Sequence, residues 1–99
     1  MSEVSLDQVD LGRWRLEGSL TLATVTDLAA QGKRLAASGG TIELDLAGIH
    51  HSSSAAVALL LEWQEQMHRS AGQLHLRNCP EALRRIAEFS NVDGLLGLA

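Results

Sequence analysis

The chain has 99 residues, 45% of them hydrophobic and 20% charged, which predicts one small globular domain over residues 1–99. Its formal net charge of -4 supplies no basic patch, so we expect no nucleic-acid partner. No apolar run is long enough to cross a bilayer, and the first ten residues lack a signal-peptide pattern, which predicts a cytoplasmic protein without direct membrane insertion. The single cysteine, Cys79, excludes an internal disulfide, and we interpret it as a small buried hydrophobe.

The first two predicted elements are strands, over residues 3–9 and 13–18. Val4 and Leu6 share one side of the first strand, and Trp14 and Leu16 share one side of the second. A short turn containing Gly12 separates them, so the simplest pairing is an antiparallel hairpin.

A helix is predicted over residues 24–38, because apolar residues recur there at helical intervals. Thr24 can cap its first turn, and Asp27 lies at the spacing of a capping box. The two glycines Gly39 and Gly40 predict its end.

The second half of the chain contains two further alternating segments, at 41–46 and 73–77, which we interpret as strands with one buried face. A helix is predicted between them, beginning at Ser52 or Ser53. The last helix is expected to have Pro80 at its first position and four residues on its buried face: Leu83, Ile86, Ala87 and Phe89. The predicted order β-β-α-β-α-β-α gives an α/β fold, a mixed and mostly four-stranded sheet with helices packed on one face.

Two histidines and three serines, at 50–54, raise the hypothesis of a catalytic or metal site. A nucleophilic serine requires a base within hydrogen-bond reach, which adjacent residues seldom provide, and the elbow motif G-x-S-x-G does not occur. The four histidines show no metal-binding spacing. We therefore expect no catalytic residues, no metal and no cofactor, and keep a small serine hydrolase using Ser54 as an alternative.

The serines can instead begin a helix, because a serine oxygen at the N-cap accepts from free amides of the first turn. The next seven residues, 55–61, are apolar all round the helix, whereas a surface helix should carry a polar face. Ala58 and Leu61 cannot both face the core that receives Ala56 and Trp63. The pattern predicts a protein-protein interface at this helix, with a partner-facing set of His51, Ser52, Ser53, Ser54, Ala55 and Ala56.

Three segments together resemble the STAS domain family, which includes sulfate-transporter and anti-sigma-factor-antagonist domains. They are LEGSLT at 16–21, IELDLAGI at 42–49 and SSSAAVALLL at 52–61. In the resemblance, Ser54 matches the family's phosphorylatable or functionally required Ser/Thr and is a possible phosphoacceptor. Ser53 stands where the family usually has an acid, and Ala56 where a glycine is common.

Within the family, the segments 55–63 and 84–98 most resemble the STAS subunit of bacterial Mla phospholipid-transport ABC complexes. The resemblance implies a non-catalytic cytoplasmic subunit, peripheral to the inner membrane, that binds the transporter's ATPase subunit and supports its assembly or activity in outer-membrane lipid asymmetry. The alternative is an anti-sigma-factor antagonist regulated by phosphorylation of Ser54.

Overall fold

The computed structural model describes residues 4–98 and has five strands and four helices in that range. The expected domain limits, 1 and 99, and the expected start of the first strand at residue 3 lie outside the described residues. The strands are β1 (Val4–Asp10), β2 (Arg13–Ser19), β3 (Thr41–Asp45), β4 (Ile49–His51) and β5 (Gln73–Arg77). The helices are α1 (Leu22–Ala29), α2 (Gly32–Ser38), α3 (Ser54–Arg69) and α4 (Glu81–Phe89).

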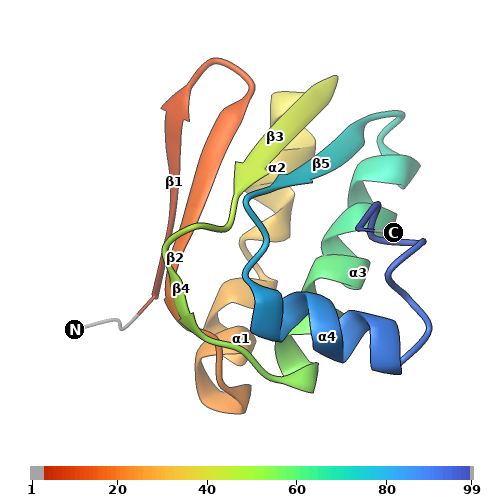
Figure 1. Ribbon diagram of the computed structural model, residues 1–99. Coiled ribbons are helices and arrows are strands. Elements are labelled where there is room, and N and C mark those ends of the chain that lie inside the picture. The colour runs from red at the N-terminus through yellow and green to blue at the C-terminus, as the bar shows by residue number, and fades with distance from the viewer. Residues whose placement is uncertain (1–3, 99) are drawn as a thin grey trace.

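The strands form one mixed sheet in the order β1-β2-β3-β5 (Figure 1). β1 and β2 are the predicted antiparallel hairpin, and β2, β3 and β5 run parallel. The short strand β4 was not predicted. It pairs with the C-terminal end of β2, beyond the part of β2 that pairs with β3. The chain therefore leaves β3, passes the turn at 46–48 and returns to β2 before α3 begins.

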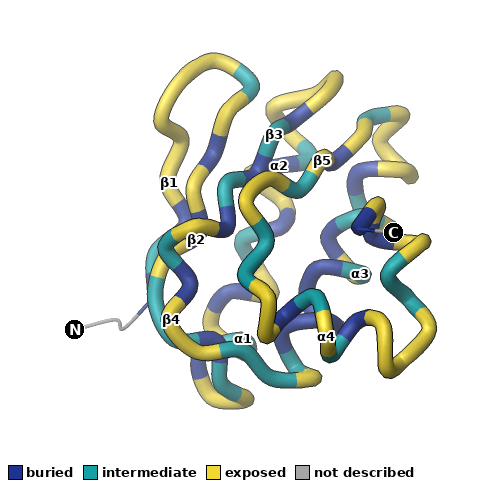
Figure 2. Tube along the Cα trace, viewed as in Figure 1, coloured by how far each residue is buried: buried dark blue, intermediate teal, exposed yellow. Residues whose placement is uncertain are grey.

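Helices cover one face of the sheet, with α3 at the centre of the helical layer. α3 contacts α1, α2, α4 and β5. The alternation of each strand explains this arrangement, because residues such as Leu16, Leu44 and Leu74 point toward the helices while their neighbours face away. Figure 2 shows the alternation along the sheet, and the exposed tip of the β1–β2 hairpin beyond the core. The expected mixed α/β fold with one covered face is confirmed.

The helix expected over 24–38 is two helices. α1 begins earlier, with Thr21 as N-cap, and the capping box joins Thr21 to Thr24 instead of Thr24 to Asp27. The chain turns after Ala29, and Gly32 then packs against Trp63 of α3, where an added Cβ would lie 2.6 Å from Trp63 Cδ1. Periodicity could not reveal the break, because both helices direct their leucines to the same core.

Two expectations for the last helix were wrong. Pro80 is the N-cap of α4, with extended backbone, not its first helical residue. Phe89 is 94% exposed, whereas Leu83 and Ala87 are buried. Leu83 and Ala87 are one helical turn apart, and a residue two positions after Ala87 points to the opposite side of the helix. Cys79 is half-buried against the core, more open than expected.

Candidate functional site

The start of α3 is fixed to the end of β2 by hydrogen bonds. The Ser53 hydroxyl donates to the Leu20 carbonyl oxygen at 2.9 Å, and the Leu20 amide donates to the His51 carbonyl oxygen at 2.9 Å. Of the two predicted N-caps, Ser52 and Ser53, the structure has Ser53. Its side chain does not accept from the first-turn amides, because its hydroxyl points back to Leu20. Its own carbonyl accepts from the Ala56 amide at 3.0 Å. The serine at the N-cap therefore joins two parts of the chain.

The start of α1 lies beside this junction. Thr24 is buried, and its hydroxyl donates to the Ser19 carbonyl oxygen at 2.7 Å, while its Oγ1 accepts from the Thr21 amide at 2.9 Å. The side-chain oxygen of Thr21, Oγ1, in turn accepts from the Thr24 amide at 3.3 Å. The neighbouring residues Ser19 and Thr21 bond to the first turn of α1, and Leu20 between them bonds to Ser53 at the start of α3. The two helices therefore begin at the same end of the molecule (Figure 1).

The proposed interface residues differ in their access to solvent. His51 and Ser54 are exposed, and Ser52, Ser53 and Ala55 are half-buried. Ala56 has no exposed surface and packs in the core, so it cannot itself touch a partner as the sequence suggested. Its small side chain serves the packing of α3 instead.

The surface continues onto residues that the sequence did not assign to the interface. Ala58, one turn after Ser54, is exposed, and Leu61 is half-buried, which agrees with the expectation that they do not both face the core. Leu22, the first residue of α1, is 75% exposed. No sequence signal marked this position, because the helix was predicted to begin at Thr24 and its N-cap is Thr21. We define the α3-start surface as His51, Ser52, Ser53, Ser54, Ala55, Ala58 and Leu22.

The histidines do not assemble a catalytic or metal site with the serines. His50 and His51 are exposed on β4, His68 lies in the last turn of α3, and His75 lies on β5. No hydrogen bond joins a histidine to a serine side chain within residues 4–98, and no group of three or more metal-binding side chains occurs in that part of the chain. Within the same residues, no helix is long and apolar enough to cross a membrane.

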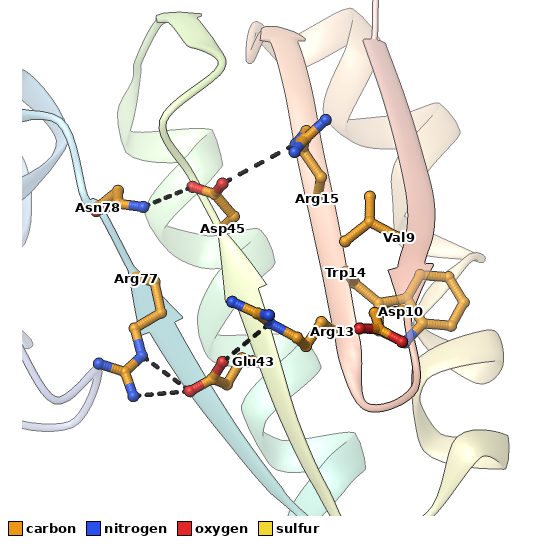
Figure 3. Close-up of a pocket in the computed structure, with 9 residues that line it drawn as sticks. All are labelled: Val9, Asp10, Arg13, Trp14, Arg15, Glu43, Asp45, Arg77 and Asn78. Atoms are coloured by element: carbon orange, nitrogen blue, oxygen red, sulfur yellow. Dashed lines mark hydrogen bonds and ion pairs between the residues drawn. The ribbon is translucent and has the colours of Figure 1, made fainter.

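A second polar surface lies on the face of the sheet that no helix covers (Figure 3). Glu43 accepts from Arg77 at 2.7 Å and lies 3.5 Å from Arg13 Nε. Asp45 accepts from the Ala47 amide at 2.9 Å and from Asn78 at 3.0 Å, and lies 3.9 Å from Arg15. We name Arg13, Arg15, Glu43, Asp45 and Arg77 the charged face.

These contacts change the acidity of one carboxyl group. The hydrogen bond from the Ala47 amide, then that from Asn78, and more weakly the charge of Arg15, lower the pKa of Asp45 below its ordinary value. At Cys79, the residue after Asn78, burial raises the pKa of the thiol, which makes it a poor nucleophile near neutral pH.

Comparison with known proteins decides the family. A family model described as "Mlab, STAS domain" matches residues 8–97, nearly the whole chain. The chain belongs to the STAS domain family. No curated protein sequence matches it.

Two solved structures share the fold of this STAS domain. The phosphorylated form of the Bacillus cell fate determinant SpoIIAA superposes with a TM-score of 0.69 at 21% identity, covering 95% of this chain and 85% of that chain. The unphosphorylated anti-sigma factor antagonist SpoIIAA has the same TM-score at 18% identity, covering 97% and 98%. These likenesses establish the STAS fold.

Proposed function

We propose that this STAS domain is a non-catalytic cytoplasmic subunit that binds the ATPase subunit of an Mla-type ABC phospholipid transporter, and thereby supports transporter assembly or activity. The observation that carries the proposal is the match of residues 8–97 to the family model described as Mlab. Through the ATPase and its permease, the subunit lies at the inner membrane and contributes to outer-membrane lipid asymmetry.

The α3-start surface is the part of the domain that we assign to the ATPase. Its side chains on and just before α3 are short, with Ser54 and Ala58 exposed on successive turns, so a partner can approach the backbone of α3 closely. Leu22, the first residue of α1, adds an exposed apolar side chain at the same end of the molecule (Figure 1). The Ser53–Leu20 hydrogen bond holds the surface in one shape, which lowers the entropic cost of binding.

An anti-sigma-factor antagonist is the second candidate, and one observation favours it. Ser54 is exposed at the first position of α3, where a phosphate would meet the positive end of the helix dipole. Ser53 lacks the carboxylate that the family usually has next to the phosphoacceptor, which favours the transporter subunit.

The experiment that separates the two is affinity purification of the tagged full chain from native membranes and from the soluble fraction, followed by mass spectrometry. The proposed function predicts that an ABC ATPase and its permease are recovered from the membrane fraction at near-stoichiometric amounts. Recovery of an anti-sigma kinase from the soluble fraction, without transporter subunits, would replace the proposal with the second candidate.

A further inference from the structure

β5 is an edge strand with unused backbone hydrogen-bonding groups. The Gln73 amide donates to the Gly40 carbonyl oxygen at 3.1 Å, and the Arg77 carbonyl accepts from the Leu46 amide at 2.9 Å, so alternate residues of β5 turn their backbone toward β3. The other two residues, Leu74 and Leu76, turn their backbone amide and carbonyl groups away from β3. No backbone or side chain of residues 4–98 bonds to these outward groups. β5 therefore offers a free edge to another strand.

The opposite edge of the sheet, β1, is protected. Its pairing with β2 is irregular between Gln8 and Asp10, and a bulge of this kind twists a strand away from a new neighbour. Arg34 Nη1 also donates to the Leu6 carbonyl oxygen at 3.1 Å. Exposed charge at Asp7 adds to the protection. β5 has neither a bulge nor a covering side chain of this kind.

A groove of about 720 Å³ runs beside the free edge. One wall is α3, where Leu61 is half-buried, and the other is the segment 94–97, where Leu95 is 69% exposed. The helix-facing side chains of an added strand would point into this groove, whose lining includes Leu61, Leu95 and Leu96 as well as Glu65 and His68. Its alternate side chains would continue the charged face of the sheet.

The charged face favours an acidic neighbour at this edge. Glu43 pairs with both Arg13 and Arg77, so three arginines share two carboxylates, Glu43 and Asp45. Arg77 is the outermost arginine, and its side chain is 62% exposed. A carboxylate on an added strand could therefore reach Arg77 from its open side.

We propose that the free edge of β5 binds an extended segment of a partner protein in which acidic residues alternate with aliphatic ones. Backbone hydrogen bonds to Leu74 and Leu76 supply affinity, and the two side-chain rows supply selectivity. The interior strand β3 already shows this pattern beside β5, with Ile42 and Leu44 toward the helices and Glu43 on Arg77. This binding surface is separate from the α3-start surface and does not depend on the proposed function.

A second copy of the chain fits the edge less well. Antiparallel pairing of two β5 strands around His75 would place the two His75 side chains opposite each other and Arg77 opposite Gln73 of the second copy. Gln73 of the second copy would then bring no carboxylate to the open side of Arg77, which contacts Glu43 of its own chain. The charge pattern thus favours a different, acidic chain.

The test uses the full ¹⁵N-labelled chain and, as probe, a synthetic peptide with the sequence GTIELDLA, which is that of residues 40–47. We expect saturable amide shifts at Leu74 and Leu76 and in the segment 94–97. The same peptide with lysine at both acidic positions should bind clearly more weakly. Arg77→Gln should weaken binding of the acidic peptide roughly two- to fivefold. Arg15→Gln, on the same face but away from the edge, should leave it unchanged.

Three results would overturn the proposal. The first is the absence of saturable shifts at millimolar peptide. The second is equal binding of the acidic and lysine peptides. The third is a set of β5 shifts that grows with protein concentration in the absence of peptide, because this would show that a second copy occupies the edge.

Discussion

Ser53 and Leu20, 33 residues apart, are joined by a hydrogen bond of 2.9 Å between the Ser53 hydroxyl and the Leu20 carbonyl oxygen. Leu20 is completely buried and lies between β2 and the cap of α1, so the bond fixes the first turn of α3 relative to both. The shape of the α3-start surface therefore depends on a polar contact within the fold.

Ser53→Ala should remove this bond, in which the carbonyl oxygen of the buried residue Leu20 is the acceptor. The expected loss is about 1 kcal/mol in the free energy of unfolding, or roughly 4–8 °C in melting temperature. Ser52→Ala is the matched control, because no hydrogen bond of the Ser52 side chain occurs within residues 4–98. Urea denaturation of the two variants makes the comparison. Equal stability of the two would show that the bond does not hold the junction.

Gly32→Ala should destabilise the domain although alanine favours helices. The new Cβ would overlap the Trp63 ring, 2.6 Å from Cδ1, and also the side chain of Gln66. Overpacking costs about 1–3 kcal/mol, which exceeds the gain of up to about 1 kcal/mol in helix propensity. Gly94→Ala, where nothing lies within 4 Å of the added atom, should change stability little. Thermal melts that rank the two variants in the opposite order would contradict the packing seen between α2 and α3.

Asp45 should make stability depend on pH in the acidic range. Because its pKa is lowered in the folded state, its contribution is fully present above the unfolded pKa, near 4, and is lost as pH falls through the folded value. Asp45→Asn should therefore be less stable than the parent at pH 7, by roughly 0.5–1 kcal/mol given its partial exposure. The difference should shrink toward pH 2. Asp27→Asn, on the exposed surface of α1, is the control. If Asp45→Asn were still less stable than the parent at pH 2, ionisation of Asp45 would not be the cause of the difference.

Ala56 and Ala58 should respond oppositely to glutamate. Ala56 is fully buried, so Ala56→Glu places a charge in the core and should cost about 3 kcal/mol or more, with loss of folded protein. Ala58 is exposed, so Ala58→Glu should keep its melting temperature close to that of the parent. Circular dichroism melts distinguish them. A stable Ala56→Glu variant would show that the first turns of α3 can rotate.

The alternation of short strands and helical segments is sufficient to predict the fold class. The repeated pairs Trp14 and Leu16, and Leu74 and Leu76, define one apolar face on each of two strands, and that face lies toward the helices in the structure. Sequence periodicity fails where a tertiary contact decides the outcome. The break before Gly32 depends on Trp63 in another helix, and β4 is too short to show alternation of its own.

The site is predictable in position but not in detail. A run of serines before an apolar helix correctly locates the start of α3, because such residues favour helix N-termini. Which alanine faces outward depends on the direction of the core. Ala56 lies on the buried side with Trp63, so its place in the predicted partner-facing set was wrong. The bond from Ser53 to Leu20 is also beyond the sequence, since it joins residues 33 positions apart.

The measurement that tests the central claim most directly is co-purification of the transporter ATPase with Ser54→Arg, alongside the melting temperature of the same variant. Ser54 is exposed at the start of α3, so we expect a melting temperature close to that of the parent and loss of most of the bound ATPase, on the order of a tenfold weaker complex. Ser38→Arg, at the end of α2 and at the opposite end of the molecule, is the matched control and should bind normally (Figure 1). Normal ATPase binding by a folded Ser54→Arg variant would contradict the assignment of the α3-start surface to the transporter.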